Sequence, residues 1–120
     1  MSDANPFTTA LGEFRATYSV TQREIAKSMG ITDGNISKIE RGLVVPTMNF
    51  VDKMFDALNL EKAGYWYDKL HVALLQSRGK IVIDLENYTE DQIRLILTLT
   101  GRVSTYNSIQ CKFVGERLPE

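Results

Sequence analysis

The sequence predicts a mainly α-helical protein with a small α+β segment at its C-terminal end, and three observations lead to this fold class. Four short helical patterns separated by turn residues fill about the first 60 positions. A fifth helical pattern follows, and beyond it short β-branched runs lie on either side of one more helix. The 120 residues are 43% hydrophobic and 24% charged, which is the composition of a chain that folds around a core.

The first helix is predicted over residues 6–17. Asn5 and Pro6 form a typical helix start, because an asparagine side chain caps the amides of the first turn and proline fits the first helical position. Four large side chains then recur at helical spacing on one face: Phe7, Leu11, Phe14 and Tyr18.

A second, two-turn helix is predicted to start at Thr21. Thr21 and Glu24 match a capping box, in which the Thr21 hydroxyl accepts from the Glu24 amide and the Glu24 carboxylate accepts from the Thr21 amide. We expect the helix to end at Met29, because Gly30 stands where so short a helix needs a left-handed residue.

The third helix is predicted between the link 30–32 and Gly42. Ile36 and Ile39, three positions apart, turn toward the core. The other side of this helix is hydrophilic and should face solvent: Asp33, Asn35, Ser37, Lys38 and Arg41.

A fourth helix is predicted from Pro46 and Thr47 to a stop at Asn59, and a fifth from Leu60 to about Ser77. Three consecutive apolar residues precede the fourth helix, at 43–45. We expect them to tuck beneath that helix, and contact with a partner subunit is the alternative.

The C-terminal part should contain strands as well as a helix. Residues 80–85 form a short β-branched run typical of a strand, and residues 109–114 form a second candidate strand. Thr89 and Gln92 match a second capping box, which opens a helix to about residue 100, ended by Gly101.

Composition excludes several classes of function. A net charge of -1 excludes a uniformly basic chromatin-type or membrane-surface protein. One cysteine, Cys111, and one histidine, His71, provide neither a disulfide nor a zinc cluster, so we expect no metal and no cofactor. Without a basic and apolar leader or a run of about 18 apolar residues, we expect a cytoplasmic protein with no membrane partner.

The stretch from Thr21 to Gly42 indicates the function. Two short helices joined by a glycine turn, the second with a polar outer face, have the geometry that places one helix against phosphates and the next in a major groove. The runs TQREIAKSMGIT (21–32) and ISKIERG (36–42), with Pro46 following, resemble the lambda-repressor-like (Cro/CI-type) helix-turn-helix family over residues 7–60. The resemblance implies a DNA-binding domain of four to five helices.

The resemblance also implies roles for individual residues. Ala26 and Gly30 match positions that let the two helices pack and turn. The positions that read bases are matched by Thr32, Asp33, Gly34, Ser37 and Lys38, and we expect direct readout to rest on Asn35, Ser37 and Lys38, with the base left open. Asp33 and Gly34 depart from the glutamine-rich pattern of the family, because aspartate only accepts hydrogen bonds and glycine has no side chain.

Phosphate contacts are expected from residues that flank the two helices. They are Gln22, Arg23, Arg41, Thr47 and Asn49. For the last three, ordinary solvated surface is the equal alternative. Arg15 and Glu40 match a paired arginine and glutamate that ties the first helix to the third, which is a structural role.

We therefore interpret residues 1–78 as the DNA-binding domain and residues 79–120 as a dimerisation segment. The predicted function is that of a transcriptional regulator of double-stranded DNA, a homodimeric repressor of phage or mobile-element type on pseudo-palindromic operators. The alternative is a protein-interaction module, such as an antitoxin, antirepressor or co-regulator, on the same scaffold. An enzyme is not expected, because no nucleophile or paired acid and base can be identified.

Overall fold

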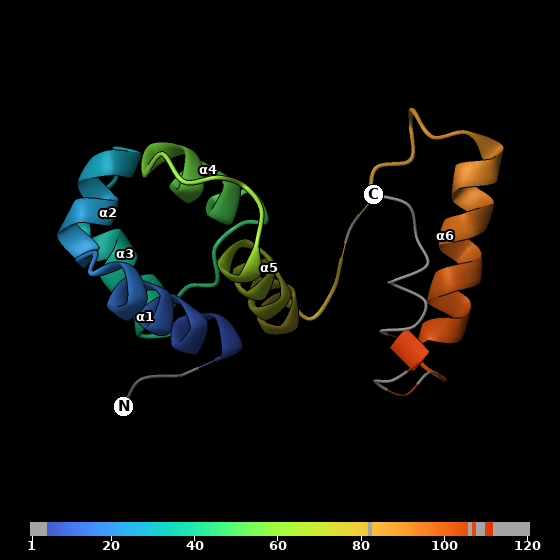
Figure 1. Ribbon diagram of the computed structural model, residues 1–120, viewed down its shortest axis with the longest axis horizontal. Helices are drawn as coiled ribbons and strands as arrows, with labels where there is room; N and C mark the ends of the chain where they lie inside the picture. Colours follow the sequence, from blue (N-terminus) through green and yellow to red (C-terminus); the bar gives the residue numbers. More distant parts are fainter. Residues whose placement is uncertain (1–4, 82, 106, 108–109, 112–120) are drawn as a thin grey trace. The chain divides into compact units, whose positions relative to one another are not determined.

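The computed structural model describes residues 5–81, 83–105, 107 and 110–111. Its helices are α1 (Pro6–Tyr18), α2 (Gln22–Met29), α3 (Asp33–Glu40), α4 (Phe50–Ala57), α5 (Tyr65–Arg78) and α6 (Glu90–Val103) (Figure 1). The chain divides into two compact units, Met1–Ile81 with α1 to α5 and Val82–Glu120 with α6.

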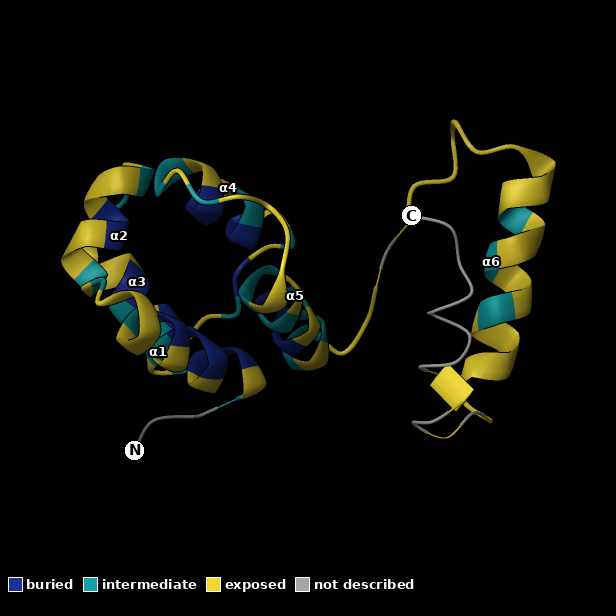
Figure 2. Ribbon diagram, viewed as in Figure 1, coloured by how far each residue is buried: buried dark blue, intermediate teal, exposed yellow. Residues whose placement is uncertain are grey.

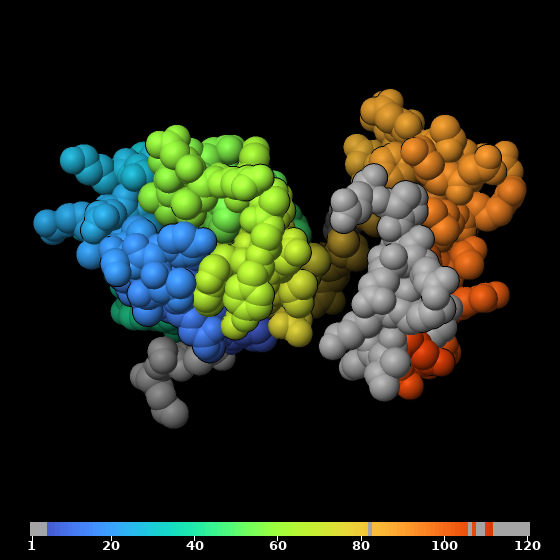
Figure 3. Space-filling model, in the orientation of Figure 1, coloured from blue at the N-terminus to red at the C-terminus, as the bar shows by residue number. Residues whose placement is uncertain are grey.

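The first unit is a helical domain built around one core. Its helices surround a common centre, with α1 against α3 and α5, α2 against α3 and α4, and α4 against α5 (Figure 1). Their buried faces point inward (Figure 2), and side chains fill the space between the ribbons (Figure 3). The fully buried large side chains come from all five helices: Phe7, Leu11, Phe14, Ile25, Ile36, Val51, Met54, Leu70 and Leu74.

Local signals set the first three helices as predicted. The Asn5 side chain accepts from the Thr8 amide at 3.0 Å, and Thr8 accepts from the Asn5 amide at 2.9 Å. Thr21 accepts from the Glu24 amide at 3.1 Å. The predicted return bond of that capping box is wrong, however, because the Glu24 carboxylate accepts from the Thr21 hydroxyl and not from the Thr21 amide. Tyr18, at the end of α1, is 44% exposed, and its ring centroid lies 4.8 Å from that of Phe14 on the same face.

The fourth and fifth helices begin later than predicted. α4 starts at Phe50 instead of Pro46, and residues 46–49 are loop and turn. α5 starts at Tyr65 instead of Leu60, because Gly64 has a φ of 95°, which an α-helix does not accommodate. Both corrections shorten a helix and lengthen the loop before it.

The apolar loop 43–45 tucks inward only in part. Val45 packs against the core, whereas Leu43 is 54% exposed and Val44 is 46% exposed. The prediction that all three residues would lie beneath α4 is therefore wrong for two of them. Two apolar side chains face solvent just after α3.

The second unit contains no strand among its described residues, so the α+β prediction is wrong there. Residue 81 and residues 83–85 are not in a strand, because a β-branched run forms a ladder only with a partner strand. Of the candidate strand 109–114, residues 109 and 112–114 lie outside the described residues. Gln110 and Cys111 are helical and follow a capping box of Asn107 and Gln110.

Helix α6 opens as predicted and ends later. Thr89 and Gln92 form the expected capping box. Gly101 lies inside the helix instead of ending it, because α6 continues to Val103. No residue of α6 is buried (Figure 2). Among the described residues, no helix has the length and apolar character that crossing a bilayer requires.

Candidate nucleic-acid interface

The turn between α2 and α3 fixes the angle at which these helices meet. The Ile31 amide donates to the Ala26 carbonyl at 2.9 Å, and Gly30 between them has a φ of 71°. A Cβ on Gly30 would meet no described atom within 4 Å, so glycine is needed for its backbone and not for space. Ala26 is fully buried, which allows the two helices to approach closely.

The outer face of α3 is polar and turned to solvent. The Thr32 hydroxyl accepts from the Asn35 amide at 3.2 Å and so begins the helix. Ile36 and Ile39 point into the core, which leaves the opposite side outward. Of the predicted base contacts, Ser37 is half-buried and the others are exposed: Thr32, Asp33, Gly34, Asn35 and Lys38.

A network of three side chains ties α3 to the rest of the domain. Arg15 of α1 meets Glu40 of α3 through two hydrogen bonds, one from Nε to Oε1 and one from Nη2 to Oε2 at 2.9 Å. Arg15 Nη1 also donates to the Val20 carbonyl at 3.3 Å. The Arg15 side chain is 25% exposed and the Glu40 side chain 13%. The pair thus lies mostly inside the protein, where its geometry is fixed.

Gln22 joins the same network. Its Nε2 donates to Glu40 Oε2 at 2.8 Å, although the sequence predicted a phosphate contact for this residue. One hydrogen of the amide group is used in this bond, and the other can still donate to a phosphate. The network therefore holds the Gln22 amide in one orientation at the start of α2.

A second ion pair lies at the start of α3. Arg23 Nε and Asp33 Oδ2 are 3.3 Å apart, with side chains 85% and 54% exposed. Arg23, a predicted phosphate contact, and Asp33, a predicted base contact, thus pair with each other within the protein. The pair offsets the positive charge that Arg23 would otherwise bring to this face, and two residues ten positions apart gave no sequence signal of it.

The α3–α4 loop carries the remaining predicted phosphate contacts. Arg41, Thr47 and Asn49 are all exposed, and the Thr47 hydroxyl donates to Asn49 Oδ1 at 2.6 Å. Arg78, at the end of α5, donates from Nη1 to the Pro46 carbonyl at 2.9 Å. Sequence reasoning missed Arg78, and its place in the last turn of a helix gave only a general signal for a cation.

The lone histidine lies in a structural cluster between α4 and α5. His71 Nδ1 is 2.9 Å from the Tyr67 carbonyl, and His71 Nε2 is 3.8 Å from Asp52 Oδ1. The Tyr67 hydroxyl donates to the same Asp52 oxygen at 2.5 Å. This hydrogen bond, together with burial, raises the pKa of Tyr67 above its ordinary value. The contacts satisfy both side chains within the fold.

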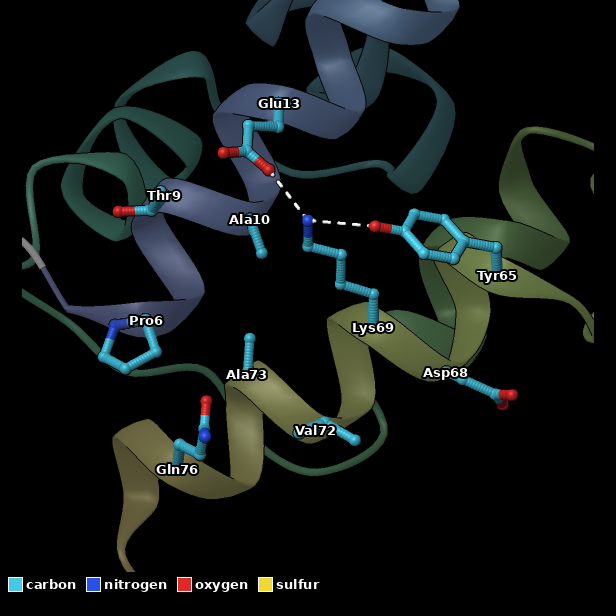
Figure 4. Close-up of a pocket in the computed structure, with 10 residues that line it drawn as sticks. All are labelled: Pro6, Thr9, Ala10, Glu13, Tyr65, Asp68, Lys69, Val72, Ala73 and Gln76. Carbon is cyan, nitrogen blue, oxygen red and sulfur yellow. Dashed lines mark hydrogen bonds and ion pairs between the residues drawn. The ribbon is translucent and has the colours of Figure 1, made fainter. Parts of the chain in front are cut away.

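A groove of about 740 Å³ runs between α1 and α5. Ala10 and Ala73 line it, and Lys69 reaches across to Glu13 at 3.0 Å and to the Tyr65 hydroxyl at 3.2 Å (Figure 4). These two hydrogen bonds raise the pKa of Lys69. Among the described residues, no three histidine, cysteine or acidic side chains gather as metal ligands.

Comparison with known proteins agrees with this geometry. A family model described as helix-turn-helix matches residues 11–64. The match covers α2, the turn and α3, and it confirms the resemblance to the lambda-repressor-like family. No curated protein and no solved structure matches the chain.

The match to a helix-turn-helix family indicates a DNA-binding transcription regulator. The match ends before α5, so Arg78, all of α6 and the α5 side of the groove lie outside the matched residues.

Proposed function

We propose that the protein is a sequence-specific repressor of phage or mobile-element type that binds pseudo-palindromic operators as a homodimer and catalyses no reaction. The outward polar face of α3 carries this proposal. Its predicted base contacts are exposed except for the half-buried Ser37, and the Arg15–Glu40–Gln22 network fixes the helix behind them. A rigid helix with a polar outer side is what major-groove readout requires.

The residues divide into two roles in this proposal. Base edges are read by the outer face of α3, where Asp33 can accept from cytosine N4 and Lys38 can donate to a guanine. Phosphates are held by Gln22, Arg23, Arg41, Thr47 and Asn49, which position the domain without reading sequence. For Arg23 this role requires that it contact a phosphate while paired with Asp33 or after leaving it.

Dimerisation through residues 79–120 completes the operator site. One helix-turn-helix domain reads only about 4 to 6 base pairs, so two copies on half-sites about 34 Å apart supply the missing information. The apolar residues of α6 are only partly covered or are exposed, among them Ile93, Ile96, Leu97 and Leu99. Leu97, which is 67% exposed, would gain the most by burial against a second copy.

The direct test is selection of bound fragments from a random-sequence DNA pool, followed by titration of the selected duplex. We expect an enriched inverted repeat. Gln22→Ala and Arg41→Ala should weaken binding to every sequence, whereas Lys38→Ala should change the preference at one base pair by about 1 to 3 kcal/mol. A pool that stays random after repeated selection would contradict sequence-specific binding.

The dimer has its own test in solution. Leu97→Glu places a charge on the apolar side of α6 and should shift the protein to a monomer in analytical ultracentrifugation, with weaker binding to the selected repeat. Thr98→Glu is the matched control, because it adds the same charge to the exposed neighbouring position. If both variants sediment like the unchanged protein, α6 is not the dimer interface.

A protein-interaction module is the second candidate, and two observations favour it. Asp33 offsets the charge of Arg23 at the start of α3, and Leu43 and Val44 expose apolar surface beside the helix. Such a surface is better suited to contact with another protein than to contact with a phosphate backbone, which fits an antitoxin, antirepressor or co-regulator. Absence of salt-dependent binding to any duplex at low salt would favour this function over repression.

A further inference from the structure

We propose that Arg78 is a further DNA-contacting residue, which holds the α3–α4 loop in place and at the same time binds a backbone phosphate. The inference rests on the DNA-binding function proposed above and adds a contact from α5. Arg78 lies 14 residues beyond the end of the helix-turn-helix match at residue 64.

The position of the guanidinium group is the first step of the argument. Its Nη1 donates to the Pro46 carbonyl at 2.9 Å, and Pro46 is itself buried. The next residue, Thr47, is exposed and is a proposed phosphate contact. Successive Cα atoms are about 3.8 Å apart, so the Arg78 guanidinium lies close to the backbone of Thr47.

The loop itself is attached to the DNA-reading helix, which is the second step. The Leu43 amide donates to the Lys38 carbonyl at 2.9 Å, so the loop leaves α3 directly from its C-terminal turn. Arg78 then fixes the far part of the loop through a bond that spans 32 residues of sequence. One side chain of α5 thereby sets where the loop lies relative to α3.

The chemistry of arginine is the third step. A guanidinium group has five N–H donors, and the single bond to Pro46 leaves others available. Arg78 is half-buried, and no acidic side chain among the described residues forms an ion pair with it. The end of the α5 dipole favours a cation here, yet no carboxylate of the described residues neutralises the Arg78 charge, so an anion can still bind it. A planar fork of donors suits phosphate.

The test measures the salt dependence of binding to a 30-base-pair random-sequence duplex by fluorescence anisotropy. Arg78→Gln keeps an N–H donor for Pro46 and loses the charge. Losing one phosphate contact should reduce the slope of log K against log salt by about 0.9 per protomer. The ratio of wild-type to variant affinity should then fall about 3.5-fold between 50 and 200 mM salt.

Two further variants separate a phosphate contact from a merely structural role. Arg78→Lys should keep the slope, because the charge remains. Lys62→Gln is the matched control: it removes one positive charge at the other end of α4, where Lys62 pairs with Asp56 at 3.1 Å, and should leave the slope unchanged. Thermal unfolding followed by circular dichroism verifies that each variant is folded.

Three results would overturn the assignment of Arg78. They are an unchanged slope in Arg78→Gln, an equal loss of slope in Lys62→Gln, or an equal loss of slope in Arg78→Lys together with a lower melting temperature. In each of these the wild-type protein still binds the duplex, so the DNA-binding function stands. A wild-type protein that binds no duplex at 50 mM salt overturns both proposals together.

Discussion

Removing Glu40 should destabilise the helix-turn-helix domain more than removing any exposed acidic residue. Glu40 accepts two hydrogen bonds from Arg15 and one from Gln22, and its side chain is only 13% exposed. Glu40→Ala would leave the Arg15 guanidinium with the Val20 carbonyl as its one partner among the described residues. A mostly buried cation would then lack a counter-charge.

The structure sets the size of the effect. Breaking a fully buried ion pair costs about 3 to 5 kcal/mol, because the remaining charge is stranded. Arg15 is 25% exposed, so water screens part of that loss, and we expect about 2 to 3 kcal/mol for Glu40→Ala. With a urea dependence of about 1 to 3 kcal/mol per molar, the unfolding midpoint should fall by about 0.7 to 3 M.

A double-mutant cycle isolates the pair from other effects of the substitutions. Arg15→Met, Glu40→Gln and the double variant should give a coupling free energy of about 1.5 to 2.5 kcal/mol. In the Arg15→Met background, Glu40→Gln should be neutral or stabilising. Glu40 is the last residue of α3, where the helix dipole disfavours a carboxylate by about 0.3 to 1 kcal/mol.

Urea unfolding followed by tryptophan fluorescence is the assay. Trp66 is the single tryptophan of the chain, and its ring centroid lies 6.1 Å from that of Phe14 in the domain core. Glu13→Gln is the control, since it breaks an exposed pair with Lys69 and should cost less than about 0.5 kcal/mol. A coupling energy below about 0.5 kcal/mol, or a Glu40→Ala cost equal to that of Glu13→Gln, would refute the reasoning.

Three other predictions use the same unfolding assay. Gly30→Ala should cost about 1 kcal/mol through its φ of 71° alone, and a cost near zero would show that the turn adjusts. Thr32→Ala should cost about 1 kcal/mol by removing the cap of α3, with Thr32→Ser as the variant that restores it. Tyr67→Phe should cost about 1 kcal/mol near neutral pH. The folded pKa of Tyr67 is raised, so its bond to Asp52 contributes stability below about pH 10 and loses it as pH rises through the folded pKa. The difference between wild type and Tyr67→Phe should therefore shrink above that pH, and a constant difference would contradict this.

Sequence alone predicted those elements whose signals are local. The caps at Asn5 and Thr89 act across three residues, and Gly30 needs only its own backbone freedom, so each could be identified without the fold. The start of α4 could not. Pro46 looks like the first residue of a helix, yet its carbonyl is held by Arg78, and a contact across 32 residues has no local trace.

The same distinction explains the candidate site. The outward face of α3 followed from the spacing of Ile36 and Ile39, because a helix turns by a fixed angle per residue. The contacts that these outward residues make with other side chains did not follow from the sequence. The pairing of Arg23 with Asp33 depends on how α2 and α3 are arranged in space, and no sequence pattern indicated it. Strand predictions failed for a related reason, since a strand needs a partner that a β-branched run cannot specify.

Charge pairing at the interface has a consequence for how the protein would find its operator. Arg15 and Arg23 already have acidic partners, so the positive charge available to phosphates comes mainly from Lys38, Arg41 and Arg78. Few uncompensated cations give a shallow salt dependence and weak binding to random DNA. Weak non-specific binding also means less competition from the rest of a genome, so affinity for the operator must come from base contacts and from the second protomer. A regulator built in this way would lose nearly all operator occupancy as a monomer, which is the outcome that Leu97→Glu examines.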